Sequence, residues 1–438
     1  MADTQVELTP IDVVVQNVRI TSTNGKKVID ITDLVSAIDI NEALFTPILT
    51  GVMLIVDAAG LLTELPVLSQ EKITFDIVKP GAGERAFTKS CEFRVRQIDK
   101  IERVNDITNV YQLRLVEESY YWNAIQPVSQ SFKGTIDTMM TEIAESYLRT
   151  TITADPTSGL FQCVIPGWRP YETMQWLSGR ARSERNDSFY LYTTFFDGLQ
   201  LRSSRNLFEQ DPVNEKTVFS HKQDIPKSTA DAIRPDNPEA VADSAFVFEV
   251  VKNTPTTQLT LDGVYGKTYT LLDSLNKNYE ELRWNFDERF EELPHLSKHK
   301  VLSDEIKYDG QTLPSYSTDE DVYVYSSSAF DSPSHMSYNQ DVLNTVPFST
   351  ATDMTLGNFV YKFAVAGDKN IQVGKTINVH YNRNIELSDT DNKSRDDRRS
   401  GKHMIGAVKH RFHLNKNQYT QMIEVNRDTM DEDHDYEN

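Results

Sequence analysis

The sequence Cys-Glu-Phe-Arg-Val-Arg, residues 91–96, alternates apolar and charged side chains and indicates the fold class. A period of two places the apolar side chains on one face of a β-strand and the charged side chains on the other. The same pattern recurs in residues 111–115 and 73–77, and residues 13–15 and 28–31 are further strand-like runs. Because strands with one polar face are typical of antiparallel sheets, we expect the N-terminal part of the chain to form an antiparallel barrel or sandwich.

The apolar spacing becomes helical after about Tyr120. A helix is predicted after Gly134, with Thr135 as its cap. A second helix is predicted to begin at Pro170, which suits the first turn, with Glu172 favourable to the helix dipole. The apolar stripes of these two helices are Ile136, Met139, Met140, Ile143 and Tyr147, and then Met174, Leu177 and Ala181.

A β-hairpin is predicted to follow the second helix. The aromatic run Phe189–Phe196 and the run Leu199–Arg202 are separated by Asp197-Gly198, a strong short-range hairpin signal. Residues 120–205 are therefore interpreted as a small α+β unit.

The rest of the chain contains long polar segments between a few patterned ones. We expect a loop or crossing linker at 221–244, which holds Pro226, Pro235 and Pro238, and a possible helix at Tyr279–Phe290. Further along, the pattern indicates a weakly patterned polar stretch at 303–350, a strand with an early turn at Val373–Tyr381, a solvated loop at Ser388–Lys402, a closing hairpin of His403–Leu414 and Tyr419–Arg427, and an acidic tail from Asp428 to Asn438.

Composition excludes several classes of protein. The 438 residues suggest about three domains. With 45 basic and 65 acidic residues the formal charge is −20, which disfavours a nucleic-acid clamp and docking on anionic membranes. Two cysteines do not make a disulfide framework, the N-terminus lacks a signal-peptide pattern, and the apolar stretch Ala43–Val56 is too short to span a bilayer. We expect a soluble, acidic protein without membrane insertion, made in the cytoplasm.

A search for catalytic and binding motifs predicts no catalytic, cofactor-binding or metal-binding residue. The triplets Gly266-Lys-Thr and Gly374-Lys-Thr lack the glycine that a phosphate-binding loop needs five positions earlier, where Leu261 and Lys369 stand. They are interpreted as turns that enter strands. Paired carboxylates cannot be assigned, because 65 acidic residues provide too many pairs.

The histidines and cysteines have simpler interpretations. His295 and His299 lack the His-Glu-x-x-His pattern. His410 and His413 fall on opposite faces of a predicted strand. We expect exposed or hydrogen-bonded histidines, and Cys91 as a small core residue.

The order of segments resembles the central hub protein of contractile phage baseplates, of the T-even type, which is related to the N-terminal part of type VI secretion spike proteins. The segments are Ile38–Phe45, Leu49–Asp57, Leu65-Pro66 before Glu71–Ile73, Tyr111–Val116, Val128–Gly134, Ile165-Pro166, Pro170, Trp176-Leu177, Asp197-Gly198, Gly401–His410 and Tyr419–Asp428. The similarity covers most of the chain and becomes weaker between about 254 and 350. Its specificity comes from the order of the segments.

The resemblance implies a mainly β protein with α+β decorations, in which two tube-like antiparallel β-barrel domains carry smaller inserted domains. Under this interpretation residues 1–119 form the first barrel, 206–253 with 351–428 the second barrel, 120–205 a small α+β domain, 254–350 an inserted domain, and 429–438 a disordered acidic tail.

The resemblance also implies a structural role and no enzymatic activity. Family members form trimers with pseudo-sixfold rings, so we expect a homotrimer between the tail tube or its initiator proteins and the central spike, beside neighbouring baseplate proteins in the virion. DNA would pass through the ring without specific binding during ejection, and an acidic wall would keep it mobile. No cofactor is implied.

Two alternatives come from other functional classes. A cell-wall-degrading tail enzyme would need a carboxylate pair in a cleft. A glycan-binding tail module would need exposed aromatic platforms, for which Trp122, Trp168, Trp176 and Trp284 are candidates, although core packing is the simpler interpretation of these residues.

Overall fold

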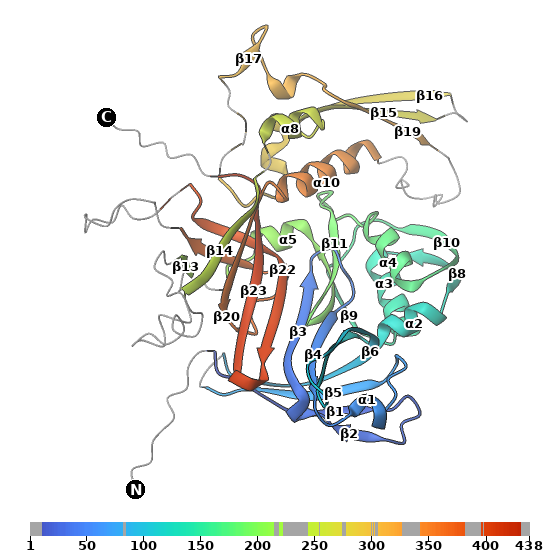
Figure 1. Ribbon diagram of the computed structural model, residues 1–438. Coiled ribbons are helices and arrows are strands. Elements are labelled where there is room, and N and C mark those ends of the chain that lie inside the picture. The colour runs from blue at the N-terminus through green and yellow to red at the C-terminus, as the bar shows by residue number, and fades with distance from the viewer. Residues whose placement is uncertain are drawn as a thin grey trace, which may run out of the picture.

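The protein is mostly β-structure, and most of its strands join one large sheet (Figure 1). The computed structural model describes residues 11–81, 85–213, 219–221, 244–253, 255–273, 277–298, 300, 302, 305–325, 342–381, 396 and 398–430. The large sheet has 13 strands and two smaller strand groups lie beside it in each of the lateral units. Among the described residues, no helix is long and apolar enough to cross a membrane.

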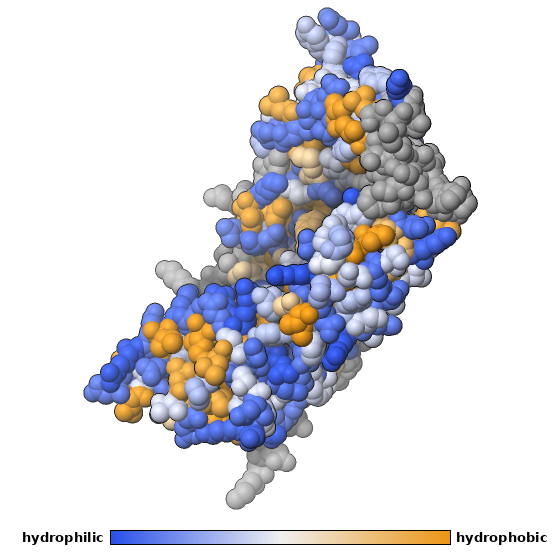
Figure 2. Space-filling model, turned by 90° about the vertical axis from the view of Figure 1, so that its right-hand side faces the viewer, coloured by the Kyte–Doolittle hydropathy of each residue, from blue (hydrophilic) through white to orange (hydrophobic). Residues whose placement is uncertain are grey.

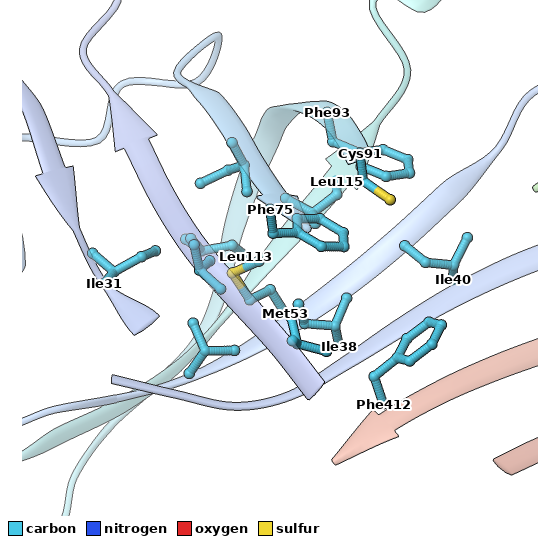
Figure 3. Packing of buried hydrophobic residues seen from close by; sticks show 14 of the residues in the cluster. Ile31, Ile38, Ile40, Met53, Phe75, Cys91, Phe93, Leu113, Leu115 and Phe412 are labelled. Atoms are coloured by element: carbon cyan, nitrogen blue, oxygen red, sulfur yellow. The ribbon is translucent and has the colours of Figure 1, made fainter. Parts of the chain in front are cut away.

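Seven strands of the large sheet come from the N-terminal part of the chain and pair in the order β2-β1-β5-β6-β7-β4-β3. Their bounds are β1 Val14–Thr21, β2 Val28–Asp30, β3 Val35–Ala43, β4 Thr50–Asp57, β5 Lys72–Lys79, β6 Phe87–Arg103 and β7 Asn109–Val116, with the short helix α1 at Leu61–Glu64. The predicted alternation is confirmed: Phe75, Phe93 and Leu113 are buried in one core with Met53 (Figure 3).

The C-terminal hairpin closes this first barrel. Strand β22, Gly401–His413, pairs antiparallel with β3, and strand β23, Gln418–Arg427, pairs with β22. Asp12 forms an isolated antiparallel bridge with Gln418, next to the start of β1. The strands therefore form a closed ring, and Phe412 of β22 lies in the same interior as the N-terminal core (Figure 3).

The same hairpin closes a second barrel. The pairing runs β22-β21-β13-β14-β20-β23 and returns to β22. The added strands are β13 Phe219–His221, β14 Ser244–Asn253, β20 Phe359–Ala366 and β21 Thr376–His380. The predicted closing hairpin is confirmed, and it belongs to both barrels rather than to the second alone. The domain boundaries themselves stay a prediction.

The small α+β unit has the predicted helices and hairpin. Its elements are α2 Ser119–Ile125, β8 Val128–Gly134, α3 Ile136–Ile143, a π-helix at Ala144–Leu148, β9 Ile152–Ala154, β10 Phe161–Trp168, α4 Pro170–Ser178, β11 Phe189–Thr194, β12 Gly198–Ser203 and α5 Ser204–Glu209. Gly198 has a φ of 73°, which is why this turn needs glycine. The helices are shorter than predicted, so Tyr147 lies in the π-helix and Ala181 lies beyond α4.

The inserted part, at the upper end of Figure 1, has a three-stranded sheet in the order β16-β15-β19. Its elements are α8 Thr256–Leu261, β15 Gly266–Asp273, β16 Asn278–Asn285, α9 Phe286–Arg289, β17 Lys307–Tyr308, β18 Gln311–Thr312, β19 Glu320–Tyr325 and α10 Val342–Leu356. The predicted helix at Tyr279–Phe290 is wrong except for its last four or so residues, because Leu282 and Trp284 alternate with exposed Glu281 and Arg283 as in a strand.

Several predictions fall wholly or partly on residues that the structure does not describe. The linker at 221–244 is described only at its two ends, and residues 388–395 and 397 of the predicted loop and 431–438 of the predicted acidic tail lie outside the described residues. The stretch 303–350 contains β17, β18, β19 and the start of α10, which the weak pattern did not predict.

Gly51 in β4 provides a test of the packing between three strands. It pairs with Ile40 on β3 and with Leu115 on β7, and a Cβ on Gly51 would lie 2.9 Å from Ile40 Cδ1 and 3.1 Å from the Asp39 carbonyl oxygen. Gly51→Val should therefore lower the free energy of unfolding by about 1–3 kcal/mol. Chemical denaturation measures this. Gly179→Ala is the control, since a Cβ there meets only ordinary contacts, and equal losses in both variants would contradict the packing argument.

Candidate functional site

The candidate ligands and nucleophiles of the sequence do not come together in the described parts of the chain. No group of three or more His, Cys, Asp and Glu side chains there could hold a metal ion. Both cysteines are buried and free, and burial raises the pKa of the Cys91 thiol to about 12 and that of Cys163 to about 11. These thiols are therefore core groups rather than nucleophiles at neutral pH.

The other candidates have structural roles. Gly266 begins β15, and Gly374, with a φ of 80°, precedes β21, so both triplets are turns that enter strands as predicted. His295 stacks on Phe290, and its Nδ1 lies 2.6 Å from the carbonyl oxygen of Ser297. His299 lies outside the described residues.

The most distinctive polar group is a buried cluster in the shared hairpin, centred on His410 of β22. His410 Nε2 lies 2.8 Å from Glu42 Oε1, and both side chains are completely inaccessible to solvent. On its other side, His410 Nδ1 lies 2.7 Å from the Tyr419 hydroxyl and 3.2 Å from Gln421 Nε2. We call Glu42, His410, Tyr419 and Gln421 the junction cluster.

Hydrogen bonding fixes the tautomer of His410. The Gln421 amide is oriented by two backbone groups, since its Oε1 accepts from Asp368 N–H at 2.8 Å and its Nε2 donates to the Ile371 carbonyl at 2.9 Å. Nε2 of Gln421 is a donor only, so His410 Nδ1 must be an acceptor and the ring proton lies on Nε2, directed at Glu42. Burial, with the negative charges of Glu42 and Asp368, raises the pKa of Tyr419 well above its usual value, so its hydroxyl keeps its proton.

Glu42 joins three parts of the structure. Strand β3 supplies the residue itself, and its carboxylate accepts from Phe195 N–H, in the turn between β11 and β12, at 2.5 Å. It also accepts from Val373 N–H, in the loop before β21, at 3.1 Å. One carboxylate thus links the first barrel, the small α+β unit and the second barrel, and all its partners are N–H donors.

A buried lysine adds a further contact between the two barrels. Lys79, at the end of β5, donates to the carbonyl oxygen of Gly367, which follows β20, and its Nζ lies 5.5 Å from the centre of the Tyr419 ring. Burial lowers the pKa of Lys79 to about 8, against the opposing effect of Asp368. Nearby, Arg85 Nε lies 3.3 Å from Asp368 Oδ2.

A second buried carboxyl lies between the first barrel and the small α+β unit. Glu117 follows β7 and precedes α2, and its Oε2 accepts from Leu49 N–H at 3.3 Å. Burial raises the pKa of Glu117 to about 7, although the hydrogen bond from Leu49 and the charge of Lys89 oppose this. The carboxyl therefore favours its protonated form in the folded protein.

The tryptophans do not present open platforms for a sugar. Trp284 is buried and donates to the Val264 carbonyl at 3.1 Å. The guanidinium of Arg149 lies 4.3 Å from the ring centre of Trp122, and that of Arg180 lies 3.9 Å from the ring centre of Trp176. Trp168 packs edge-to-face with Trp176 at 5.5 Å.

A polar cavity of about 330 Å³ lies in the small α+β unit. Its acidic side chains are already engaged: Asp187 accepts from Arg205 and from the Ser183 hydroxyl, and Asp155 accepts from Ser203 N–H and from the Asn206 amide. This cavity therefore does not offer the free carboxylate pair that a glycosidase requires.

The arrangement as a whole can hold structural units together. His410 is bonded to Glu42, Tyr419 and Gln421, and the rings of Phe195 and Phe196 pack against it. These partners include no serine or thiol nucleophile. Sequence reasoning missed the junction cluster, because Glu42 is separated from His410 by more than 300 positions and only the alternation in residues 38–43 indicated an acidic residue on the apolar side.

Glu42→Gln should destabilise the junction. The amide nitrogen of glutamine is a donor, so one of the three N–H groups now bound by Glu42 would lose its acceptor. The free energy of unfolding should fall by about 1–3 kcal/mol, measured by chemical denaturation. Glu92→Gln is the matched control, since Glu92 is a surface residue 2.6 Å from Lys72, and its effect should stay within about 0.5 kcal/mol. A Glu42→Gln protein as stable as this control would refute the role of the carboxylate.

Glu117 predicts a pH dependence. The folded-state pKa of about 7 exceeds the usual value of 4.5, so the folded state binds the proton more tightly than the unfolded state does. The stabilisation is complete below about pH 4.5 and is lost as the pH rises through about 7. Unfolding measured across this interval should show a shallower decline for Glu117→Gln than for the wild type. Glu118→Gln, at a surface residue paired with Arg94, should keep the wild-type slope, and identical slopes in all three proteins would disprove the prediction.

Comparison with known proteins found similarity only at the level of structure. No family model matches the chain, and no curated protein sequence matches it. A tail protein from Neisseria meningitidis has a TM-score of 0.52 and 10% identity, and the match covers 95% of this chain and 97% of that one. The 43 kDa tail protein of prophage MuSo2 from Shewanella oneidensis has a TM-score of 0.50 and 10% identity, covering 96% and 99% of the two chains.

A weaker match is a component of the type VI secretion system of E. coli, described as structurally similar to bacteriophage T4 tail proteins, with a TM-score of 0.38, 7% identity and coverage of 94% and 76%. The two stronger matches extend over almost the whole length of both chains. The chain therefore has the mainly β fold of these phage tail proteins.

Proposed function

We propose that this protein is a structural component of a phage tail, acting as the baseplate hub that joins the tail tube to the central spike. The observation that carries the proposal is the shared fold with two tail proteins over at least 95% of each chain. The fold likeness is not confined to one barrel, so the inserted and lateral units are included in it.

The internal construction supports a structural role. Two closed barrels share one hairpin, and buried hydrogen bonds to Glu42 link them to the small α+β unit. Such a body transmits load between its two ends without relative movement of the barrels, which is what an adaptor between tube and spike requires. The ring would be a homotrimer in the contractile tail of the virion, assembled in the host cytoplasm, with a channel that DNA crosses during ejection.

The alternatives have less support. A cell-wall-degrading enzyme needs a free pair of acidic groups, and the acids of the polar cavity are engaged with Arg205, Ser203 and Asn206. A glycan-binding module needs open aromatic faces, and guanidinium groups cover those of Trp122 and Trp176. A non-enzymatic role follows from the proposal.

The oligomeric mass tests the proposal. The purified protein, alone and with the neighbouring tail proteins, should show three times the monomer mass of 50.0 kDa by light scattering coupled to size exclusion. The trimer should bind the spike protein and show no clearing of cell-wall substrate in a zymogram. A monomer under all conditions, with or without the tail proteins, would contradict the hub assignment, and clearing would favour the enzyme.

A further inference from the structure

The formal charge of −20 is distributed unevenly along the chain. Residues 254–350 contain 16 acidic and 7 basic residues, a net charge of −9. Residues 351–428, which supply four strands of the second barrel, contain 9 acidic and 13 basic residues, a net charge of +4. The inserted part and the second barrel are therefore complementary in charge.

The acidic part has a sheet face that no other element covers. On one face of the β16-β15-β19 sheet, Tyr269 and Trp284 are buried in the same core as residues of α10. On the other face, Val322 is 54% and Val324 69% exposed, and Tyr279 is 56% exposed. An antiparallel or mixed sheet normally presents polar residues to water, so exposed apolar residues here indicate an interaction surface.

Acidic side chains border these apolar residues. The strand register places Glu281 and Val322 on either side of Thr270, and Glu320 and Arg283 on either side of Thr268. The Tyr279 hydroxyl donates to Glu281 at 2.5 Å. Figure 2 shows hydrophobic residues among hydrophilic ones at the upper end of the molecule, where this sheet lies. We call the exposed residues of this face the insert face: Leu272, Tyr279, Glu281, Arg283, Glu320, Val322 and Val324.

The second barrel has a surface of the opposite character. On the outer side of β20, β23 and β22, Met422 is 46% exposed and is flanked in register by Ala364 and Lys409. The side chains of Lys362 and Lys409 are each 38% exposed, and that of Arg411 is 42% exposed. We call Lys362, Ala364, Lys409, Arg411 and Met422 the barrel face.

We propose that the insert face of one copy docks on the barrel face of a second copy. Both faces have an apolar centre, and their borders differ in sign, so the contact would bury Val322, Val324 and Met422 and pair Glu281 and Glu320 with lysines. Contact between two different faces of the same chain is heterologous, and a heterologous contact generates a ring where the rotation closes. The inference rests on the proposed trimer and names the surfaces that hold it together.

Charge reversal tests the contact. One variant carries Glu281→Lys and Glu320→Lys, a second carries Lys362→Glu and Lys409→Glu, and a third carries all four substitutions. The matched control carries Glu145→Lys and Glu172→Lys, two exposed acidic residues of the small α+β unit. Analytical ultracentrifugation gives the dissociation constant of each oligomer, and circular dichroism of each protein verifies that the monomer is folded.

Each two-residue reversal should raise the dissociation constant about tenfold, and the four-residue variant should return close to the wild-type value, since the signs at the contact are restored. The control should match the wild type, and self-association should weaken as salt increases. A wild-type trimer that all three variants retain unchanged would overturn this inference and leave the hub proposal intact. Weakening without recovery in the four-residue variant would also overturn it and would assign the insert face to a different protein. A monomeric wild type would contradict the hub proposal itself.

Discussion

The structure depends on one hydrogen-bonded hairpin that is common to two barrels. Strands β22 and β23 complete the ring that begins with β1 and also the ring that contains β20 and β21. At the point where the rings meet, Glu42 accepts three N–H groups while His410 holds the ring proton towards it. A buried carboxylate costs a large desolvation energy unless all its acceptor positions are used, so this cluster permits only one relative arrangement of the barrels.

The lateral units are built onto this frame through similar contacts. The β11–β12 turn meets Glu42 through Phe195, and the Arg205 guanidinium of α5 donates to the carbonyl of Glu292 in the inserted part. Near the C-terminal end of the described chain, Asp428 accepts from the backbone N–H groups of Leu296 and Ser297. Single backbone-to-side-chain bonds thus fix each unit, while separate apolar cores provide most of its stability.

The regular part of the fold could be predicted from sequence because its signals are local. The alternation at residues 91–96, the helix start at Pro170 and the Asp197-Gly198 turn each act within a few residues, and the structure has all three features. The helix expected at Tyr279–Phe290 failed because charged residues at every second position mimic a solvated helix over a short run. The junction cluster could not be predicted, since it depends on β3 and β22 being neighbours, which is a matter of topology.

The shared hairpin also orders the events of biosynthesis. A ribosome produces β3 and its neighbours long before residues 401–427, so the nascent N-terminal strands leave the exit tunnel without the two strands that complete their ring. The open edge of β3 then exposes unpaired backbone groups, which attract other nascent strands. Neither barrel closes before β23 is synthesised. Native folding of this protein is therefore post-translational for its largest sheet, and cells that produce it at high levels need chaperone capacity in proportion.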